Sequence, residues 1–226
     1  MQIIDFEKFI REIPYEYQAF DIKRKVWKNL SQSTIIDKIF EDNEEVTLSR
    51  SDLFHAAFDL EEFIIKVLMW GYPSKGRGKN VDNLLLPDNF NQFIHKLKLL
   101  EEKDNIILLD VYDLVKIKGL GFSTLSKILY FKKWKVESFR AMILDQRVIN
   151  SLNHGSKFKD PGIEKFKMLS YDKAIGYYED YLKFISELAL RMNVLPDQIE
   201  MFLFEFGSNL KELIVDGSMI TFKSNP

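Results

Sequence analysis

The residues with the clearest chemical pattern lie between Leu114 and Phe131, where two apolar helical stretches flank the triplet Gly119-Leu120-Gly121. Glycines permit a tight turn that other residues would strain, and Leu120 is expected to pack beneath it. A first short helix is expected to end at Ile117 or Lys118. A second helix, beginning near Ser123, would present its first N–H groups, which together with the helix dipole suit a phosphate. Lys116 and Lys118 add positive charge there. The pattern indicates a helix-hairpin-helix element that binds a DNA backbone, the alternative being an ordinary corner between two helices.

An aspartate follows this hairpin at a distance. Asp145 comes after the apolar run Met142-Ile143-Leu144 and before a predicted helix. Its carboxylate can cap that helix by accepting hydrogen bonds from the backbone N–H groups of Arg147 or Val148. A carboxylate held ionised near a helix N-terminus can also stabilise positive charge on a reacting group. Asp145 is therefore a candidate for a structural role, a chemical role, or both.

The charge distribution supports a polyanionic partner, although the net charge of the chain is −2. The stretch from Lys116 to Lys167 holds ten lysines and two arginines against four acidic residues, a local charge of +8. Local charge decides where a polyanion docks. The alternative is a solvated basic surface without a partner.

Composition excludes several kinds of site. The chain has no cysteine, which excludes disulfides, thiolate zinc sites, iron–sulfur clusters and a cysteine nucleophile. Its three histidines are widely spaced, so we expect neither a metal nor a cofactor; His154 could contact DNA or simply face solvent. No apolar run is long enough for a membrane span, and no secretory signal is evident. We expect a cytoplasmic monomer.

Helical periodicity dominates the elements that must position these residues. Helices are predicted over residues 51–70, 89–100, 171–192 and 196–206, with three more in the N-terminal third. Strand patterns are scarce, Met219 to Phe222 being the main candidate. The glycine-rich basic loop from Gly71 to Asn80 is not a phosphate-binding P-loop, because Arg77-Gly78 stands where Lys-Ser/Thr is required. The expected fold is all-α, with about ten helices of typical length.

The hairpin and the aspartate that follows it resemble those of the helix-hairpin-helix DNA glycosylases, and most closely those of the bacterial 8-oxoguanine-glycosylase-like proteins. Four blocks carry the likeness: Trp70 to Tyr72 with the glycine-rich loop, Gly119 to Phe131, Ile143 to Val148, and Leu195 to Gly207. The resemblance implies a two-lobed helical glycosylase-like domain over residues 51–226, preceded by a helical segment of unknown role over residues 1–50.

The resemblance also implies a mechanism. The target nucleotide is swung out of the duplex into a cleft beside the hairpin. Asp145 would stabilise positive charge on the sugar as the glycosidic bond breaks, and would help to position the attacking water.

Ser123 marks a departure from part of this superfamily. Bifunctional members carry at this position a lysine that attacks the sugar as an amine, whereas monofunctional adenine glycosylases carry serine. Lys127 lies four residues on, one turn along the same helix face, where the bacterial subgroup places its lysine. Lys127 is either the amine nucleophile or a cation that positions DNA; the alternative is a surface lysine.

Other residues are assigned by the same reasoning. Trp70 and Tyr72 are candidates for a base pocket, since flipped bases are commonly held between flat side chains. Phe131, Phe202 and Phe204 are expected in the core. The residues expected to contact DNA are Lys116, Lys118, Gly119, Leu120, Gly121, Ser123, Thr124 and Arg147.

Three functions remain to be compared. The first is a DNA glycosylase, with or without lyase activity, that acts on double-stranded DNA containing oxidised guanine or another modified base, including one in phage DNA. The second is a non-catalytic helix-hairpin-helix DNA-binding protein. The third, a helical interaction domain with an accidental Gly-Leu-Gly, is disfavoured because turn, aspartate and positive charge coincide in one region.

Overall fold

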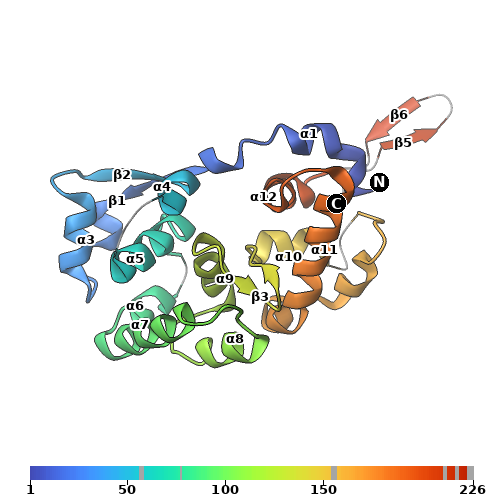
Figure 1. Cartoon of the computed structure of the whole chain (residues 1–226). Coiled ribbons are helices and arrows are strands. Elements are labelled where there is room, and N and C mark those ends of the chain that lie inside the picture. The colour runs from blue at the N-terminus through green and yellow to red at the C-terminus, as the bar shows by residue number, and fades with distance from the viewer. Residues whose placement is uncertain (56–58, 77, 154–156, 211–212, 217–218, 223–226) are drawn as a thin grey trace. The chain divides into compact units, whose positions relative to one another are not determined.

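The computed structural model describes residues 1–55, 59–76, 78–153, 157–210, 213–216 and 219–222. The chain divides into two compact units, one of residues 14–143 and one that joins residues 1–13 to residues 144–226. Helices predominate in both (Figure 1), which confirms the helical class expected from the sequence. The division follows residues 13 and 143, whereas the sequence suggested one after residue 50.

The unit of residues 14–143 is built mainly from helices. Its elements are the 3₁₀ turn η2 (Tyr15–Tyr17), β1 (Ala19–Lys23), α2 (Arg24–Trp27), α3 (Ser33–Phe40), β2 (Glu45–Ser49), α4 (Arg50–His55), α5 (Leu60–Gly71), α6 (Asn80–Leu84), α7 (Pro87–Glu101), α8 (Leu108–Leu114), α9 (Phe122–Phe131), β3 (Lys135–Val136) and β4 (Phe139–Arg140).

Helix α9 forms the centre of this unit. Every one of its residues is buried, including the polar Ser123, Thr124, Ser126 and Lys127. Helix α5 lies beside it (Figure 1) and packs against both α9 and α3. Between α3 and α5, the ammonium of Lys38 lies 2.7 Å from the carboxylate of Glu62, which is 7% exposed. The hairpin helix is therefore anchored by the core of the unit.

Two expectations for this unit were wrong. The single helix predicted over residues 51–70 is two helices, α4 and α5, because Asp59 begins a new one: its side chain accepts a hydrogen bond of 2.8 Å from the N–H of Glu62. Strands also occur where helices were expected. β1 and β2 pair antiparallel from Ala19 with Ser49 to Lys23 with Glu45. The described strands form three two-stranded sheets, so the fold is mostly helical rather than all-α.

The second unit brings the N-terminus to the last third of the chain. Its elements are η1 (Ile3–Phe6), α1 (Glu7–Arg11), α10 (Gln146–Leu152), the 3₁₀ helices η3 (Ile163–Met168) and η4 (Tyr171–Tyr177), α11 (Tyr178–Met192), α12 (Pro196–Phe202), the π-helical turn η5 (Leu203–Gly207), β5 (Leu213–Asp216) and β6 (Met219–Phe222). The helix predicted over residues 171–192 begins with the 3₁₀ stretch η4, whereas the strand at Met219–Phe222 is confirmed.

Specific contacts hold the N-terminal segment in this unit. The Arg11 guanidinium donates hydrogen bonds of 2.8 Å to the carbonyl oxygens of Met192 and Asn193, at the end of α11. The backbone N–H of Ile3 donates a bond of 2.8 Å to the buried carboxylate of Asp160. Phe6 packs on Phe202, with ring centroids 5.1 Å apart. Residues 1–13 are therefore an integral part of the unit that contains α10.

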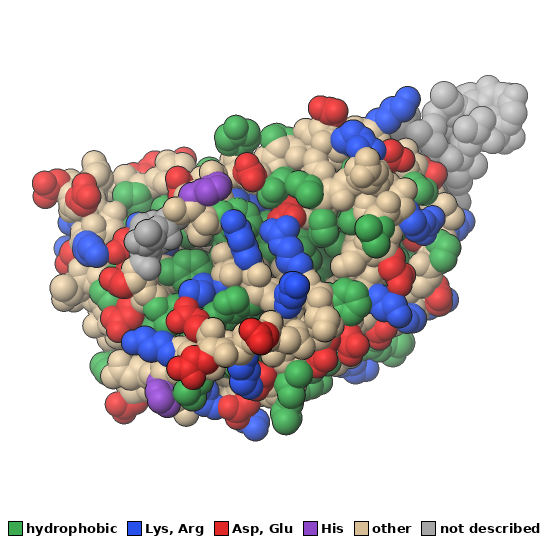
Figure 2. All heavy atoms as spheres, viewed as in Figure 1, with side chains coloured by type: hydrophobic (Ala, Val, Ile, Leu, Met, Phe, Trp, Pro, Cys, Tyr) green, Lys and Arg blue, Asp and Glu red, His purple; other side chains and the backbone are tan. Residues whose placement is uncertain are grey.

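The charge on the surface and the length of the apolar helices can be compared with the expectations from composition. On the face shown in Figure 2, acidic and basic side chains are interspersed over most of the surface, as the small net charge of −2 suggests. Among the residues that the structure describes, no helix combines the length and the apolar composition that spanning a membrane requires.

The buried carboxylate of Asp160 generates a prediction. Burial raises the pKa of Asp160 above that of an exposed aspartate, so the folded state holds this proton more tightly than the unfolded state. The stabilisation is complete below the ordinary pKa and is lost as pH rises through the folded-state pKa. The free energy of unfolding of the wild type, relative to Asp160→Asn, should therefore fall over a pH range that begins at the ordinary pKa of aspartate, about 4, and extends above it. Denaturant titrations across that range measure it.

A matched control is Asp172→Asn, a change at an exposed aspartate of the same unit. A difference between wild type and Asp160→Asn that stays constant with pH would contradict the burial argument.

Candidate functional site

The hairpin of the sequence pattern is present in the unit of residues 14–143. Helix α9 begins at Phe122, one residue from the predicted start, but α8 ends at Leu114 rather than at Ile117 or Lys118. The intervening turn is closed by backbone hydrogen bonds of 3.0 Å from Ile117 N–H to Leu114 and from Leu120 N–H to Ile117. Leu120 is 3% exposed, which confirms that it packs beneath the turn.

The two glycines of the hairpin differ in backbone conformation. Gly119 has a φ of +92°, and a Cβ atom there would lie 2.4 Å from the carbonyl oxygen of Asn80 and 2.5 Å from the nitrogen of Leu84. Gly119 is therefore required both by its conformation and by the close approach of α6. Gly121 has an ordinary φ of −81° and precedes α9 as its N-cap residue. The strain expected at both glycines applies only to Gly119.

The lysines at the turn are accessible. Lys116 and Lys118 are both exposed. Lys116 lies 3.4 Å from the carboxylate of Asp113, which also pairs with Lys96. The hydrogen bond from the Lys96 ammonium, with a smaller contribution from Lys116, lowers the pKa of Asp113. Asp113 thus stays ionised and partly offsets the charge of Lys116, which leaves Lys118 as the less compensated cation of the turn.

Lys127 is buried rather than on the surface. Its side chain is 5% exposed, and its Nζ donates a hydrogen bond of 2.9 Å to the hydroxyl of Ser123 and one of 3.3 Å to the carbonyl oxygen of the same residue. The ammonium also lies 5.5 Å from the ring centroid of Tyr72. A Cβ atom on Gly71 would meet the Cδ atom of Lys127 at 2.9 Å. The end of α5 and the first turns of α9 therefore enclose this ammonium.

Tyr72 belongs to the same cluster. Its hydroxyl lies 2.9 Å from the hydroxyl of Thr124, a residue that is 5% exposed. The structure thus brings together Tyr72, Ser123, Thr124 and Lys127 from the predicted site. The hydroxyls of Ser123 and Thr124 already have protein partners, so their use by DNA would require exchange of those partners.

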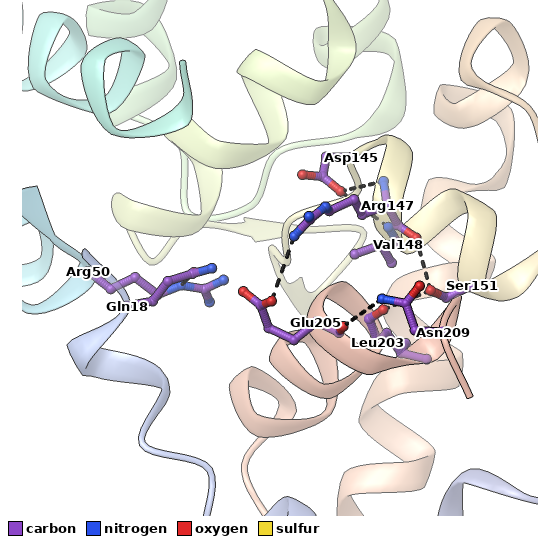
Figure 3. A network of polar contacts seen from close by, with 9 residues as sticks. All are labelled: Gln18, Arg50, Asp145, Arg147, Val148, Ser151, Leu203, Glu205 and Asn209. Atoms are coloured by element: carbon purple, nitrogen blue, oxygen red, sulfur yellow. Dashed lines mark hydrogen bonds and ion pairs between the residues drawn. The ribbon is translucent and has the colours of Figure 1, made fainter. Parts of the chain in front are cut away.

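Trp70 lies in a different environment. It is 3% exposed, its indole N–H donates a bond of 3.2 Å to the carbonyl oxygen of Gln18, and its ring meets Phe131 edge-on at 5.1 Å. The guanidinium of the buried Arg50 lies 5.3 Å from the Trp70 ring and donates to the Gln18 side chain at 2.7 Å (Figure 3). Trp70 is thus part of an aromatic core around an arginine that sequence reasoning did not single out.

Asp145 caps helix α10 in the other unit. Figure 3 shows its carboxylate beside the start of that helix, where one oxygen accepts hydrogen bonds of 3.0 Å from the N–H of Arg147 and 3.2 Å from that of Val148. These are the donors that the sequence suggested. Asp145 is half-buried, so its carboxylate is both oriented by the helix and partly accessible.

The start of α10 is itself fixed by η5. The guanidinium of Arg147 lies 4.7 Å from the ring centroid of Phe204 and 3.7 Å from the carboxylate of Glu205 (Figure 3). The Ser151 hydroxyl lies 2.7 Å from the carbonyl oxygen of Leu203. Phe204 was expected in the core, as Phe131 and Phe202 are, but it is half-buried because it covers the arginine. The pairing of α10 with η5 had no sequence signal.

Two further expectations fall outside the described residues. His154, considered for a DNA contact, lies in the gap at residues 154–156, and Arg77 of the glycine-rich basic loop lies in the gap at residue 77. Within that loop, Lys75 pairs with Asp82 at 2.8 Å.

One comparison with known proteins gives a match, which concerns the family of the chain. Residues 14–204, most of the chain, match the model of the family described as "Putative 8-oxoguanine DNA glycosylase OGG-like protein". The chain belongs to this family, which confirms the resemblance. The match begins well before residue 51, so it includes much of the segment that resembled nothing in the sequence. No curated protein and no solved structure matches the chain.

The geometry of the hairpin generates a second prediction. Gly119→Ala introduces a Cβ atom where φ is positive and the backbone of α6 is in the way. Strain of this kind costs on the order of 1–3 kcal/mol, so the free energy of unfolding should fall by at least about 1 kcal/mol. Chemical denaturation measures the change, with Gly121→Ala as the matched control because its φ is ordinary. Equal stability of the two variants would show that Gly119 is not constrained as described.

Proposed function

We propose that this protein is a DNA glycosylase that binds double-stranded DNA, turns a modified nucleotide out of the helix and cleaves its N-glycosidic bond. The observation that carries the proposal is the carboxylate of Asp145, oriented by two N–H groups of α10 in a chain of the OGG-like family. The proposal extends to a two-lobed helix-hairpin-helix glycosylase fold, in which the hairpin at Gly119–Gly121 holds one DNA strand.

The proposed chemistry follows from the charge of Asp145. As the bond between C1′ and the base breaks, its electron pair leaves with the base and positive charge builds on the sugar. An ionised carboxylate next to that sugar stabilises the charge, and it can orient a water whose oxygen then bonds to C1′. The base leaves with a proton. Because the Asp145 carboxylate accepts two backbone N–H bonds, it stays fixed in place during this step.

Lys127 offers a second route to release of the base. In its neutral form the Nζ atom could attack C1′ in place of water and displace the base, and loss of protons followed by ring opening gives an imine. The hydroxyl of Ser123, which lies 2.9 Å from the Nζ atom, fixes the direction of the nitrogen. If Lys127 does not attack, its charge serves to position DNA.

The family name suggests the class of substrate, which is 8-oxoguanine or another modified base. A release assay on DNAs with different modifications, including phage DNA, with freed bases identified by mass spectrometry, tests this. Release of 8-oxoguanine alone would assign repair, whereas release of a phage-specific base would assign defence.

The third prediction concerns Asp145. Asp145→Asn keeps a side chain of the same shape but removes the charge, so DNA affinity should be retained while base release falls by about a hundredfold or more. Single-turnover release and equilibrium binding measure the two effects. Asp59→Asn is the matched control, because Asp59 caps α5 in the same manner. Unchanged base release in Asp145→Asn would refute the enzymatic proposal and favour a non-catalytic DNA-binding protein.

The fourth prediction concerns Lys127. If its amine attacks the sugar, borohydride should trap a covalent protein–DNA complex that is lost in Lys127→Ala and persists in Lys98→Ala, a matched change at an exposed lysine of α7 in the same unit. Base release without any trapped complex would assign the step to water instead.

A further inference from the structure

A cavity separate from the hairpin lies in the unit of residues 14–143. It has a volume of about 370 Å³ and is lined by Tyr15, Glu16, Phe54, His55, Lys133 and Arg140. This volume falls within the range of ordinary ligand pockets. The lining comes from η2, from the end of α4, from the turn after α9 and from β4, and it includes no residue of the hairpin.

The rim of this cavity is mainly cationic. The Nζ atom of Lys133 lies 5.2 Å from the ring centroid of Phe54, and within the described parts of the chain no carboxylate lies at ion-pair distance from it. The guanidinium of Arg140 lies 5.7 Å from the ring centroid of Tyr130. An anion bound here would meet Lys133, Arg140 and His55 together.

The charge continues beneath the rim. The guanidinium of Arg50 is fully buried, lies 5.3 Å from the ring centroid of Tyr130 and donates a bond of 3.0 Å to the Tyr130 hydroxyl. The Tyr130 ring thus interacts with both Arg50 and Arg140. A buried cation in low dielectric strengthens the attraction of the pocket for an anion.

The remaining lining residues distinguish among anions. Tyr15 and Phe54 are half-buried aromatic side chains whose rings can stack with a flat group. The single carboxylate, that of Glu16, accepts a hydrogen bond of 3.1 Å from the Tyr15 hydroxyl. A carboxylate can also accept from the N–H groups on the edge of a nucleobase. A nucleotide carries a phosphate, a flat ring and an N–H edge in one unit, which matches the cations, the aromatic rings and the carboxylate of this lining.

We propose that this cavity binds one nucleotide of the DNA strand, with the phosphate on Lys133 and Arg140 and the unstacked base against Tyr15 and Phe54. This inference rests on the proposed DNA binding of the protein. It adds a second anchor for DNA in the same unit, separate from the hairpin.

Helix α9 sets the spacing of the two anchors. The hairpin turn immediately precedes α9, and Lys133 follows its last residue by two positions. Ten helical residues span about 15 Å, whereas successive nucleotides of one strand rise about 3.4 Å along a duplex. The two anchors are thus separated by more than the rise between neighbouring nucleotides, so the hairpin and the cavity would hold different nucleotides.

The experiment compares two exposed lysines two residues apart. Fluorescence anisotropy with a labelled single-stranded oligonucleotide and a labelled duplex measures affinity against salt for the full chain, Lys133→Gln and Lys135→Gln. Lys135 is exposed and does not line the cavity. Lys133→Gln should weaken binding more than Lys135→Gln and reduce the magnitude of the salt slope by about one, as loss of one phosphate contact does. Tyr15→Ala should weaken binding about fivefold or more without changing the slope, because stacking carries no counterions.

Different results would contradict different parts of the proposal. Equal effects of Lys133→Gln and Lys135→Gln, or no effect of Tyr15→Ala, would overturn the proposal. Added deoxyguanosine monophosphate should compete with DNA in the wild type; if it binds through Lys133 without displacing DNA, the cavity serves a free nucleotide instead. DNA binding by the same proteins separates the two proposals. A wild type that binds no DNA refutes the proposed function, whereas DNA binding that is equal in all variants refutes only the proposal for this cavity.

Discussion

The ammonium of Lys127 is buried, and the residues around it stabilise this charge away from water. A buried cation is costly unless it finds polar partners. Here the hydroxyl and carbonyl oxygen of Ser123 supply hydrogen bonds, and the face of the Tyr72 ring supplies a cation–π interaction. The Tyr72 hydroxyl is in turn held by Thr124. The first turns of α9 and the end of α5 are therefore positioned by one charge, and the hairpin that precedes α9 is held by the same packing.

The second unit applies the same principle to a negative charge. Asp145 is oriented by the first N–H groups of α10, and α10 is held against η5 through Ser151 and Arg147. A catalytic carboxylate must be fixed before the transition state forms, because reorganising it during the reaction would cost much of its benefit. In this unit the helix cap provides that fixation, so the residue's structural and proposed chemical roles support each other.

The sequence predicted the parts of this molecule that depend on local patterns. Leu120 beneath the turn, the start of α9 and the capping donors of Asp145 were all readable from residue type and spacing. The break between α4 and α5 was not, although Asp59 carries a capping signal, because apolar spacing continues across it. β1 and β2 were missed for a similar reason: five alternating residues in each are too few to stand out. The burial of Lys127, the aromatic core around Arg50 and the contact of α10 with η5 depend on distant segments, and no local pattern reports such contacts.

The absence of a side chain at Gly71 carries a consequence for how this protein can vary. The Cδ atom of Lys127 occupies the space that a Cβ atom on residue 71 would need. The two positions are therefore epistatic: a larger residue at 71 becomes acceptable only once the side chain at 127 is shortened or redirected. A chain that keeps lysine at 127 in this conformation favours glycine at the end of α5, because any larger residue there would require the Lys127 side chain to move from its partners.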